Sequence, residues 1–230
     1  MRILHLSATN ILATKNGEVE MERRVDLMRG LASDGTTIDY YPNSEGPLSI
    51  ESEEDEKDAV PGLLKSLRHA VGYNAVTLGC FGDPGLFELR QIASVPVLGP
   101  GISAIHAAGL MVDRFSILAP VETSVPSTLS QAERYGFSKK LASVRPLNIP
   151  VLTIRHDREL AVRIATEVAG ECVERDGAQA VILGCMSMAF QRIDLELKEI
   201  LGVTVINPLI SLVKMAEMLA LYGGVGVNPR

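Results

Sequence analysis

The sequence contains no tryptophan, and aromatic residues make up only 4% of the chain. Proteins that bind single-stranded nucleic acids stack the bases on aromatic side chains, so this composition does not favour such a protein. An excess of positive charge is also missing, because 28 acidic residues outnumber 22 basic ones and the formal net charge is -6. Nucleic acid backbones and anionic lipids attract basic surfaces. We therefore expect a small-molecule substrate as partner, no nucleic acid and no membrane.

Long apolar runs and metal-binding spacings are missing too. No uncharged apolar stretch reaches the roughly 18 residues that a membrane-spanning helix needs. The histidines are scattered, at positions 5, 69, 106 and 156, and no Cys-x-x-Cys or His-x-x-x-His pair is available for zinc. The turn Gly99-Pro100-Gly101 lacks the third glycine of a dinucleotide-binding loop. We expect neither a metal nor a cofactor.

Cysteine is rare, with three residues at positions 80, 172 and 185. An odd, sparse set is unsuited to a disulfide framework and is typical of reduced thiols, so we expect a cytoplasmic protein. Cys172 continues an apolar stripe at four-residue spacing with Leu160, Ile164 and Val168, which predicts a core position on a helix. Cys80 and Cys185 need another explanation.

Apolar runs alternate with amphipathic stretches along the chain, which predicts strands that alternate with helices. We predict strands at 3–6, 37–41, 75–78, 95–98, 115–118, 151–154, 180–183 and 203–206, and helices at 20–31, 51–70, 102–110, 127–135, 157–175, 190–200 and 209–222. A further helix should have Asp83 as its N-cap and Pro84 as its first residue. This alternation indicates an α/β fold in which helices flank parallel sheets.

One seven-residue sequence motif occurs twice in similar form. Residues 74–80 read Asn-Ala-Val-Thr-Leu-Gly-Cys and residues 179–185 read Gln-Ala-Val-Ile-Leu-Gly-Cys, 105 positions apart (185 − 80). The later segments that end at Pro100 and Pro208 also correspond, 108 positions apart (208 − 100). The agreement indicates an internal duplication. We expect two pseudo-symmetric lobes, at 1–112 and 113–208, with the helix at 209–222 able to pack back on the first and an active site in the cleft between them.

Both duplicated cysteines follow the carboxyl end of a predicted strand, where ligands bind in α/β sheets. Two equivalent thiols suit a reaction with two equivalent faces, such as racemisation, in which one base removes a proton and an acid on the opposite face returns one. Helix N-termini and turn amides lower the pKa of a neighbouring thiol, which allows a thiolate and a thiol to coexist near neutral pH. Cys80 and Cys185 are therefore the candidate catalytic residues.

Several longer motifs carry a family resemblance. The runs Cys80-Phe-Gly-Asp-Pro-Gly-Leu86, Gly184-Cys-Met-Ser-Met188 and Arg114-Phe-Ser-Ile-Leu118, with Tyr135-Gly136, resemble the hydantoin and allantoin racemase branch of the aspartate/glutamate racemase superfamily. The resemblance implies a cofactor-independent racemase with two pseudo-symmetric α/β lobes. It also implies that Cys80 and Cys185 act as acid and base.

The loops around the expected substrate depart from that family. Ser7-Ala8-Thr9-Asn10 stands where the family usually has Asn-Pro-Asn followed by Ser or Thr, and the segment with Thr123 and Ser124 lacks the usual arginine. Loop hydroxyls and turn amides give the candidate substrate-binding residues Ser7, Asn10, Phe81, Gly82, Thr123, Ser124, Met186 and Ser187. Neutral groups of this kind favour a neutral or weakly polar ligand. We expect a 5-substituted hydantoin or a related cyclic imide or ureide.

Other readings stay open at this point. A decarboxylase or isomerase of the same superfamily would use a cysteine to protonate an enolate. A protein of another class, which binds a metabolite without catalysis, is also compatible with the altered loops. Asp83, read as a helix cap, has the alternative role of a catalytic acid. We further expect the chain to form a homo-oligomer.

Overall fold

The computed structural model describes residues 1–223 of the 230-residue chain. Contacts divide the chain into two compact units. Unit 1 contains Met1–Ile50, Glu54–Pro100 and the described residues from Leu212 to 223, and unit 2 contains Glu51–Glu53 and Gly101–Ser211. The lobes expected from the internal duplication, 1–112 and 113–208, describe the repeat in the sequence and stay a prediction.

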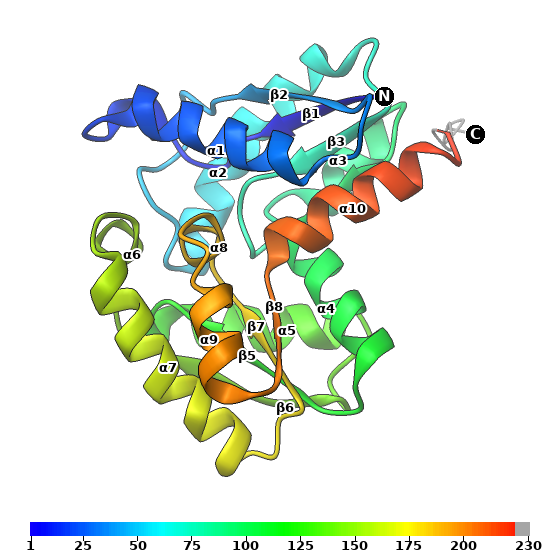
Figure 1. The fold of residues 1–230 in the computed structure, drawn as a ribbon. Coiled ribbons are helices and arrows are strands. Elements are labelled where there is room, and N and C mark those ends of the chain that lie inside the picture. The colour runs from blue at the N-terminus through cyan, green and yellow to red at the C-terminus, as the bar shows by residue number, and fades with distance from the viewer. Residues whose placement is uncertain (224–230) are drawn as a thin grey trace. The chain divides into compact units, whose positions relative to one another are not determined.

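Unit 1 is built on a four-stranded parallel sheet in the order β2-β1-β3-β4. Its strands are β1 (Arg2–Leu6), β2 (Thr37–Tyr41), β3 (Ala75–Leu78) and β4 (Val97–Leu98). Its helices are α1 (Gly17–Leu31), α2 (Glu53–Ser66), α3 (Leu86–Ile92) and the 3₁₀ turns η1 (Ile11–Ala13) and η2 (Leu67–Ala70) (Figure 1). Every residue of β3 is buried, as expected for a central strand of a parallel sheet.

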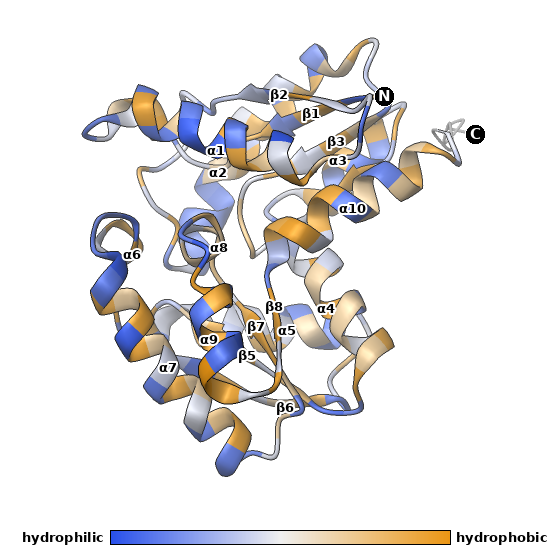
Figure 2. Ribbon diagram, in the orientation of Figure 1, coloured by the Kyte–Doolittle hydropathy of each residue, from blue (hydrophilic) through white to orange (hydrophobic). Residues whose placement is uncertain are grey.

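Unit 2 repeats this plan with a parallel sheet in the order β6-β5-β7-β8. Its strands are β5 (Phe115–Ala119), β6 (Leu141–Pro146), β7 (Ala180–Leu183) and β8 (Thr204–Ile206). Its helices are α4 (Pro100–Met111), α5 (Val125–Arg134), α6 (Val151–His156), α7 (Arg158–Glu174), α8 (Met186–Phe190) and α9 (Asp194–Leu201), with the turn η3 (Glu122–Ser124). Hydrophilic and hydrophobic residues alternate along α7 in Figure 2, as in an amphipathic helix, and its buried face joins the core formed with β5, β7 and α9.

The two sheets have the same topology, since each strand of the first has its counterpart four strands later. Leu6 of β1 lies beside Leu78 of β3, and Leu118 of β5 lies in the same way beside Leu183 of β7. In both halves, the helix that follows the last strand of the sheet belongs mostly to the other unit. Nearly all of α4 belongs to unit 2, and the larger part of α10 (Pro208–Ala220) belongs to unit 1. The predicted α/β fold with two sheets flanked by helices is confirmed.

One predicted strand is wrong. Residues 151–154 begin the helix α6, and the strand that pairs with β5 is β6, at Leu141–Pro146. A short apolar run does not distinguish a strand from a buried helical turn, and Pro150 is suited to the start of a helix. Because β6 lies at the sheet edge and each of its residues is only half-buried, it lacks the apolar run of a central strand.

Two helix starts also differ from the prediction. Helix α3 begins at Leu86 with Gly85 as its N-cap, so Asp83 is not the cap. Asp83 has a φ of 54° and sits in a tight turn in which its amide donates to Cys80 O. The helix predicted at 190–200 begins at Asp194, as α9, and residue 190 instead ends α8; Arg192, between the two helices, also has a φ of 54°. Left-handed residues interrupt regular helices, so both predicted helices begin after such a residue.

Candidate active site

Cys80 lies two residues beyond the end of β3 and is half-buried. The intervening Gly79 is closely packed, because a Cβ atom there would lie 3.0 Å from His5 Nε2 and 3.1 Å from Ser7 Cα. Since β1 and β3 are neighbours, the sheet brings the predicted residue Ser7 to the backbone that precedes Cys80. A side chain here would require the end of β1 to give by a few tenths of an ångström, so glycine suits this close approach.

Two glycines lie close to carboxylates near the turn after Cys80, one in the turn and one after β4. A Cβ on Gly82 would overlap the Glu56 carboxylate, and a Cβ on Gly99 would overlap that of Asp83. Asp83 is 5% exposed. Its side chain therefore packs against the residue that precedes α4, where the N-terminus of a helix favours negative charge. Asp83 supports the turn that carries Cys80, a role that its spacing in the sequence did not reveal.

Cys185 lies two residues beyond the end of β7, at the N-cap position of α8. A Cβ on Gly184 would overlap Leu118 O and lie 2.8 Å from Ile117 Cγ2, so this glycine also closes tightly on the neighbouring strand. Cys185 has an extended backbone, and its carbonyl accepts from the Ala189 amide at 3.1 Å. The position of each cysteine relative to its own sheet is thus the same in both units.

The surroundings of Cys185 influence its protonation in opposite directions. Burial raises the pKa of the thiol, while the amides of Ser187 and Met188, the Ser187 hydroxyl and the charge of Arg155 lower it. Burial has the larger effect, so the pKa lies above its usual value. In the absence of substrate Cys185 is therefore a thiol, the form in which it can donate a proton as an acid.

In unit 1 the remaining predicted binding residues make local hydrogen bonds. Ser7 Oγ donates to Thr9 O at 2.8 Å. Asn10 caps η1, with Oδ1 accepting from the Ala13 amide and Nδ2 donating to Ser44 O. Phe81 and Gly82 belong to the turn after Cys80, and Phe81 is buried. Their part in substrate binding stays a prediction.

In unit 2 the loop after β5 is held by Glu51. Thr123 Oγ1 donates to Glu51 O at 2.7 Å and Ser124 Oγ donates to the same oxygen at 3.2 Å. The Glu51 carboxylate accepts from the amide of Val151, the first residue of α6. The sequence indicated that the acidic run opens α2, and gave no sign that its first residue holds α6 and this loop.

Ser187 and Met186 lie beside Cys185, in the first turn of α8, and both are buried. They are the predicted binding residues that directly follow the candidate catalytic Cys185. Cys172 is fully buried on α7, as predicted, and burial raises the pKa of its thiol. It is a core residue that lies beside Ser116 and Ser143, which are within the sheet and away from the carboxyl ends of the strands where ligands bind.

The first sheet contains a buried histidine that its counterpart lacks. His5 is fully buried, its Nδ1 lies 3.0 Å from Thr77 Oγ1, and Nε2 has no hydrogen-bond partner. Burial, and secondarily the charge of Arg24, lower its pKa to about 3. The equivalent pair in the second sheet is Ile117 beside Ile182, which is apolar. The ring is therefore neutral and packs under Gly79.

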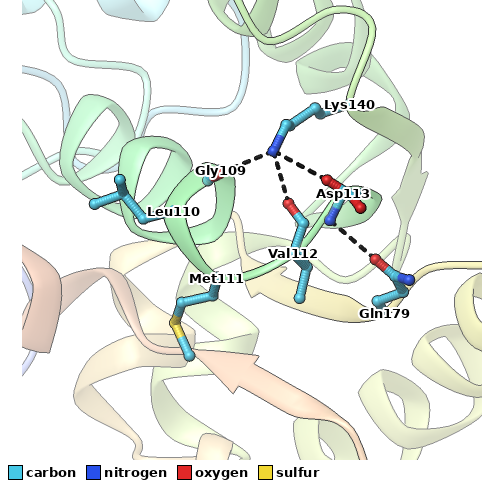
Figure 3. Close-up of a pocket in the computed structure, with 7 residues that line it drawn as sticks. All are labelled: Gly109, Leu110, Met111, Val112, Asp113, Lys140 and Gln179. Atoms are coloured by element: carbon cyan, nitrogen blue, oxygen red, sulfur yellow. Dashed lines mark hydrogen bonds and ion pairs between the residues drawn. The ribbon is translucent and has the colours of Figure 1, made fainter.

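The described part of the chain has no group of three or more His, Cys, Asp or Glu residues arranged to hold a metal ion. None of its helices is both long and apolar enough to cross a membrane. A hollow of about 420 Å³ at the end of α4 contains none of the predicted site residues. There Lys140 Nζ donates to Gly109 O and Val112 O and pairs with Asp113, as Figure 3 shows, so its charge caps the helix C-terminus.

Comparison with known proteins identifies similar proteins that are all described as racemases. A family model described as Asp/Glu/Hydantoin racemase matches residues 16–216. A hydantoin racemase from Rhizobium meliloti is 35% identical over 178 residues, which cover 76% of this chain and 73% of that protein. One from Pseudomonas sp. (strain NS671) is 33% identical over 197 residues, covering 85% of this chain and 78% of the other.

Solved structures agree. An allantoin racemase from Klebsiella pneumoniae matches with a TM-score of 0.89 and 30% identity over 98% of this chain and 90% of its own. A glutamate racemase from Francisella tularensis matches with a TM-score of 0.66 and 16% identity, over 96% of this chain and 81% of its own, and this more distant likeness concerns the fold alone.

Proposed function

Because the chain belongs to the Asp/Glu/Hydantoin racemase family and is a racemase, that is, an isomerase, we propose that it interconverts the enantiomers of a 5-substituted hydantoin or a related cyclic imide or ureide. The resemblance stated from the sequence motifs is confirmed. Family membership favours racemisation over both alternatives, the decarboxylase or isomerase of another kind and the non-catalytic binding protein. The reaction would need no cofactor.

The proposed chemistry uses both duplicated cysteines. The thiolate of one removes the proton from the carbon between the ring carbonyl and the substituent, and the electron pair passes into an enolate. The thiol of the other returns a proton to the opposite face, which leaves the first cysteine protonated and the second ionised. The support for this proposal is that Cys80 and Cys185 hold equivalent positions beyond β3 and β7, in sheets of identical topology.

One observation carries the substrate proposal. The hydroxyls of Thr123 and Ser124 both donate their protons to Glu51 O, so each has only lone pairs left to offer a ligand. A hydantoin or ureide carries N–H donors that such acceptors would bind. The ammonium group of a free amino acid carries N–H donors too, but its carboxylate needs donors or positive charge, which these two hydroxyls do not supply.

Proton NMR in heavy water tests the proposal with wild-type protein and a panel of 5-alkyl hydantoins, allantoin, aspartate and glutamate. We expect the α-proton signal of the hydantoins to disappear faster than in the absence of protein, together with loss of optical rotation. A protein that turns over aspartate or glutamate in preference to hydantoins would overturn the substrate class and leave the cysteine pair intact.

We further propose a cytoplasmic location, because the mechanism requires reduced thiols and all three cysteines are free. We also propose a homo-oligomer, since large apolar side chains are well exposed at Val71, Leu110, Leu221 and Tyr222. Light scattering of the purified protein measures the assembly. A monomer at micromolar concentration would contradict it.

A further inference from the structure

Helix α8, which begins next to Cys185, has five residues and is too short to be stable on its own. Its place therefore depends on contacts with the rest of unit 2. The Ala189 amide donates to Cys185 O at 3.1 Å, so the positions of the helix and of the cysteine are linked. The Ala189 carbonyl accepts from the Arg192 amide at 3.1 Å, where the chain turns away from the helix. A side chain that holds Ala189 thus influences where Cys185 lies.

Asn207 provides such a side chain. It directly follows β8, the strand beside β7, and is 3% exposed. Its Nδ2 donates to Ala189 O at 3.1 Å and to Asp194 Oδ1 at 2.6 Å. Its Oδ1 accepts from the Leu209 amide, in the first turn of α10, at 2.9 Å. Both N–H groups of the side-chain amide and its oxygen are engaged, so these partners fix its orientation.

Unit 1 builds the corresponding link from the opposite side. At the offset of the duplication, 108 positions (207 − 99), Asn207 corresponds to Gly99, which has no side chain. A Cβ on Gly99 would lie 1.9 Å from Asp83 Oδ1, so the buried Asp83 of the cysteine-bearing turn reaches the residue after β4. In each unit, one buried polar side chain joins the segment after the cysteine to the residue after the last strand. The recurrence of this link with a different residue indicates that the cysteine-bearing segment requires it.

The placement of α8 also determines the surroundings of the Cys185 sulfur. Burial raises the pKa of this thiol, and the amides of Ser187 and Met188, together with the Ser187 hydroxyl, lower it. These groups belong to α8 and move with it. A helix released at Ala189 would shift both the thiol and the groups that stabilise its charged form.

We propose that Asn207 is a positioning residue for Cys185: its side-chain amide holds the end of α8 so that the thiol lies where it exchanges a proton with the substrate. The inference rests on the catalytic role proposed for Cys185. Asn207 acts through Ala189 and serves one of the two cysteines, because Cys80 lies in a turn that has its own link through Asp83.

Hydrogen exchange of the protein without substrate tests the link. The amides of Ala189 and Gln191 donate to Cys185 O and Ser187 O, both at 3.1 Å, so a peptide that covers α8 reports on this helix. We expect Asn207→Ala to accelerate exchange in that peptide by about tenfold, as the loss of a buried hydrogen bond does. Unchanged protection of α8 would overturn the inference.

Asn43→Ala is the matched control. Asn43 is 2% exposed, its Nδ2 donates to Ala8 O and Ala59 O, and its Oδ1 accepts from the Glu45 amide, all within unit 1. Its loss should cost similar stability and leave the exchange of α8 unchanged. Equal acceleration in α8 by both variants would reveal a global loss of stability and contradict a specific link.

Exchange of a hydantoin α-proton in heavy water tests the consequence for catalysis. A Cys80→Ser protein retains Cys185 for one enantiomer, and a Cys185→Ser protein retains Cys80 for the other. Added Asn207→Ala should lower kcat for exchange by Cys185 about 10²-fold, as displacement of a reacting group by about 1 Å does, and leave kcat for Cys80 nearly unchanged. We compare kcat because Met186 and Ser187 on α8 are predicted to bind substrate. An equal loss in both proteins, or no loss in either, overturns the inference.

Should Asn207→Ala fail to fold, a protein with Asn207→Asp and Asp194→Asn replaces it. The pair still contains one carboxylate and one amide, and position 207 keeps an oxygen for the Leu209 amide but has no donor for Ala189 O. We expect the same selective loss of exchange by Cys185, and full exchange would overturn the inference. A wild-type protein that exchanges no hydantoin would refute the proposed substrate instead, and the hydrogen exchange of α8 then decides whether Asn207 holds the helix.

Discussion

Replacing Gly184 by alanine tests whether the cysteine-bearing turn depends on close packing. Gly184 does not have a left-handed backbone, so alanine there adds no conformational strain of its own. Its Cβ would overlap Leu118 O and lie 2.8 Å from Ile117 Cγ2. A backbone oxygen inside a parallel sheet cannot turn away as a flexible side chain does, so β7 and β5 must separate or the turn must move.

Overpacking of this kind costs about 1–3 kcal/mol of unfolding free energy. For a chain of this size the melting temperature should fall by about 2–12 °C. The turn also carries Cys185, and a displacement of about 1 Å at a reacting group costs roughly 10²-fold in rate. We therefore expect Gly184→Ala to lose more activity than its stability loss explains, at a temperature where it is fully folded.

Gly170→Ala is the matched control. Gly170 lies within α7, and a Cβ there would meet nothing within 4 Å. Alanine in a helix interior is more favourable than glycine by about 0.5–1 kcal/mol, so this variant should be slightly more stable and equally active. Urea unfolding and the racemisation rate are measured for both. A Gly184→Ala protein with wild-type stability and rate would refute the reasoning.

Three further outcomes are expected. Cys172→Ala should keep nearly full racemase activity and lose only a little stability, because its fully buried thiol lies in the core and away from the carboxyl ends of the strands; a loss of activity beyond tenfold in the folded variant would contradict this. Burial would raise the pKa of Glu217, but hydrogen bonds from the Ser33 amide, Lys214 and Thr36 lower it to about 2. Its contribution to stability is thus complete above the unfolded pKa near 4.5 and is lost as pH falls toward 2, and Glu217→Gln should flatten urea stability across that window. A chelator should leave activity unchanged and iodoacetamide should remove it, and activity that a chelator abolishes and zinc restores would count against the cysteine mechanism.

Much of the fold could be predicted because the central strands are regular. The apolar runs at β3 and β7 are fully buried strands, and the repeated Gly-Cys phrase marked the duplication that the identical sheet orders now display. The edge strand β6 escaped prediction, since half-buried residues such as Ser143 and Arg145 lack an apolar pattern. The strand was predicted instead at residues 151–154, which belong to α6, because a short apolar run is compatible with a strand or a buried helix.

The hydrophobic pattern of the sequence also did not predict which helix residues pack against the sheet. On α7 the fully buried residues are Ala161, Ala165, Ala169 and Cys172, while the larger side chains of Leu160, Ile164 and Val168 flank the core. Three positions of the predicted stripe were displaced by one residue and Cys172 was not, since small residues occupy the face of closest approach. Periodicity predicts that a helix has an apolar face but not which residues touch the sheet.

The candidate site was predictable in its thiols and less so in their surroundings. Cys80 and Cys185 stand where a duplicated strand ends, which the sequence shows directly. Arg155 and His5 are buried charged or titratable residues, and a sequence pattern assigns such residues to the surface. Glu51 acts through a long-range contact with Val151 that no local spacing encodes.

Proton exchange by the single cysteine variants tests the two-base mechanism most directly. Each enantiomer of a 5-alkyl hydantoin is incubated in heavy water with Cys80→Ser or Cys185→Ser, and with the double variant as background, while NMR and optical rotation are followed. One remaining thiolate can remove the α-proton of a single enantiomer and return a deuteron to the same face. We therefore predict that each variant exchanges one enantiomer without racemising it, and that the two variants select opposite enantiomers. Full racemisation by either variant would contradict the account.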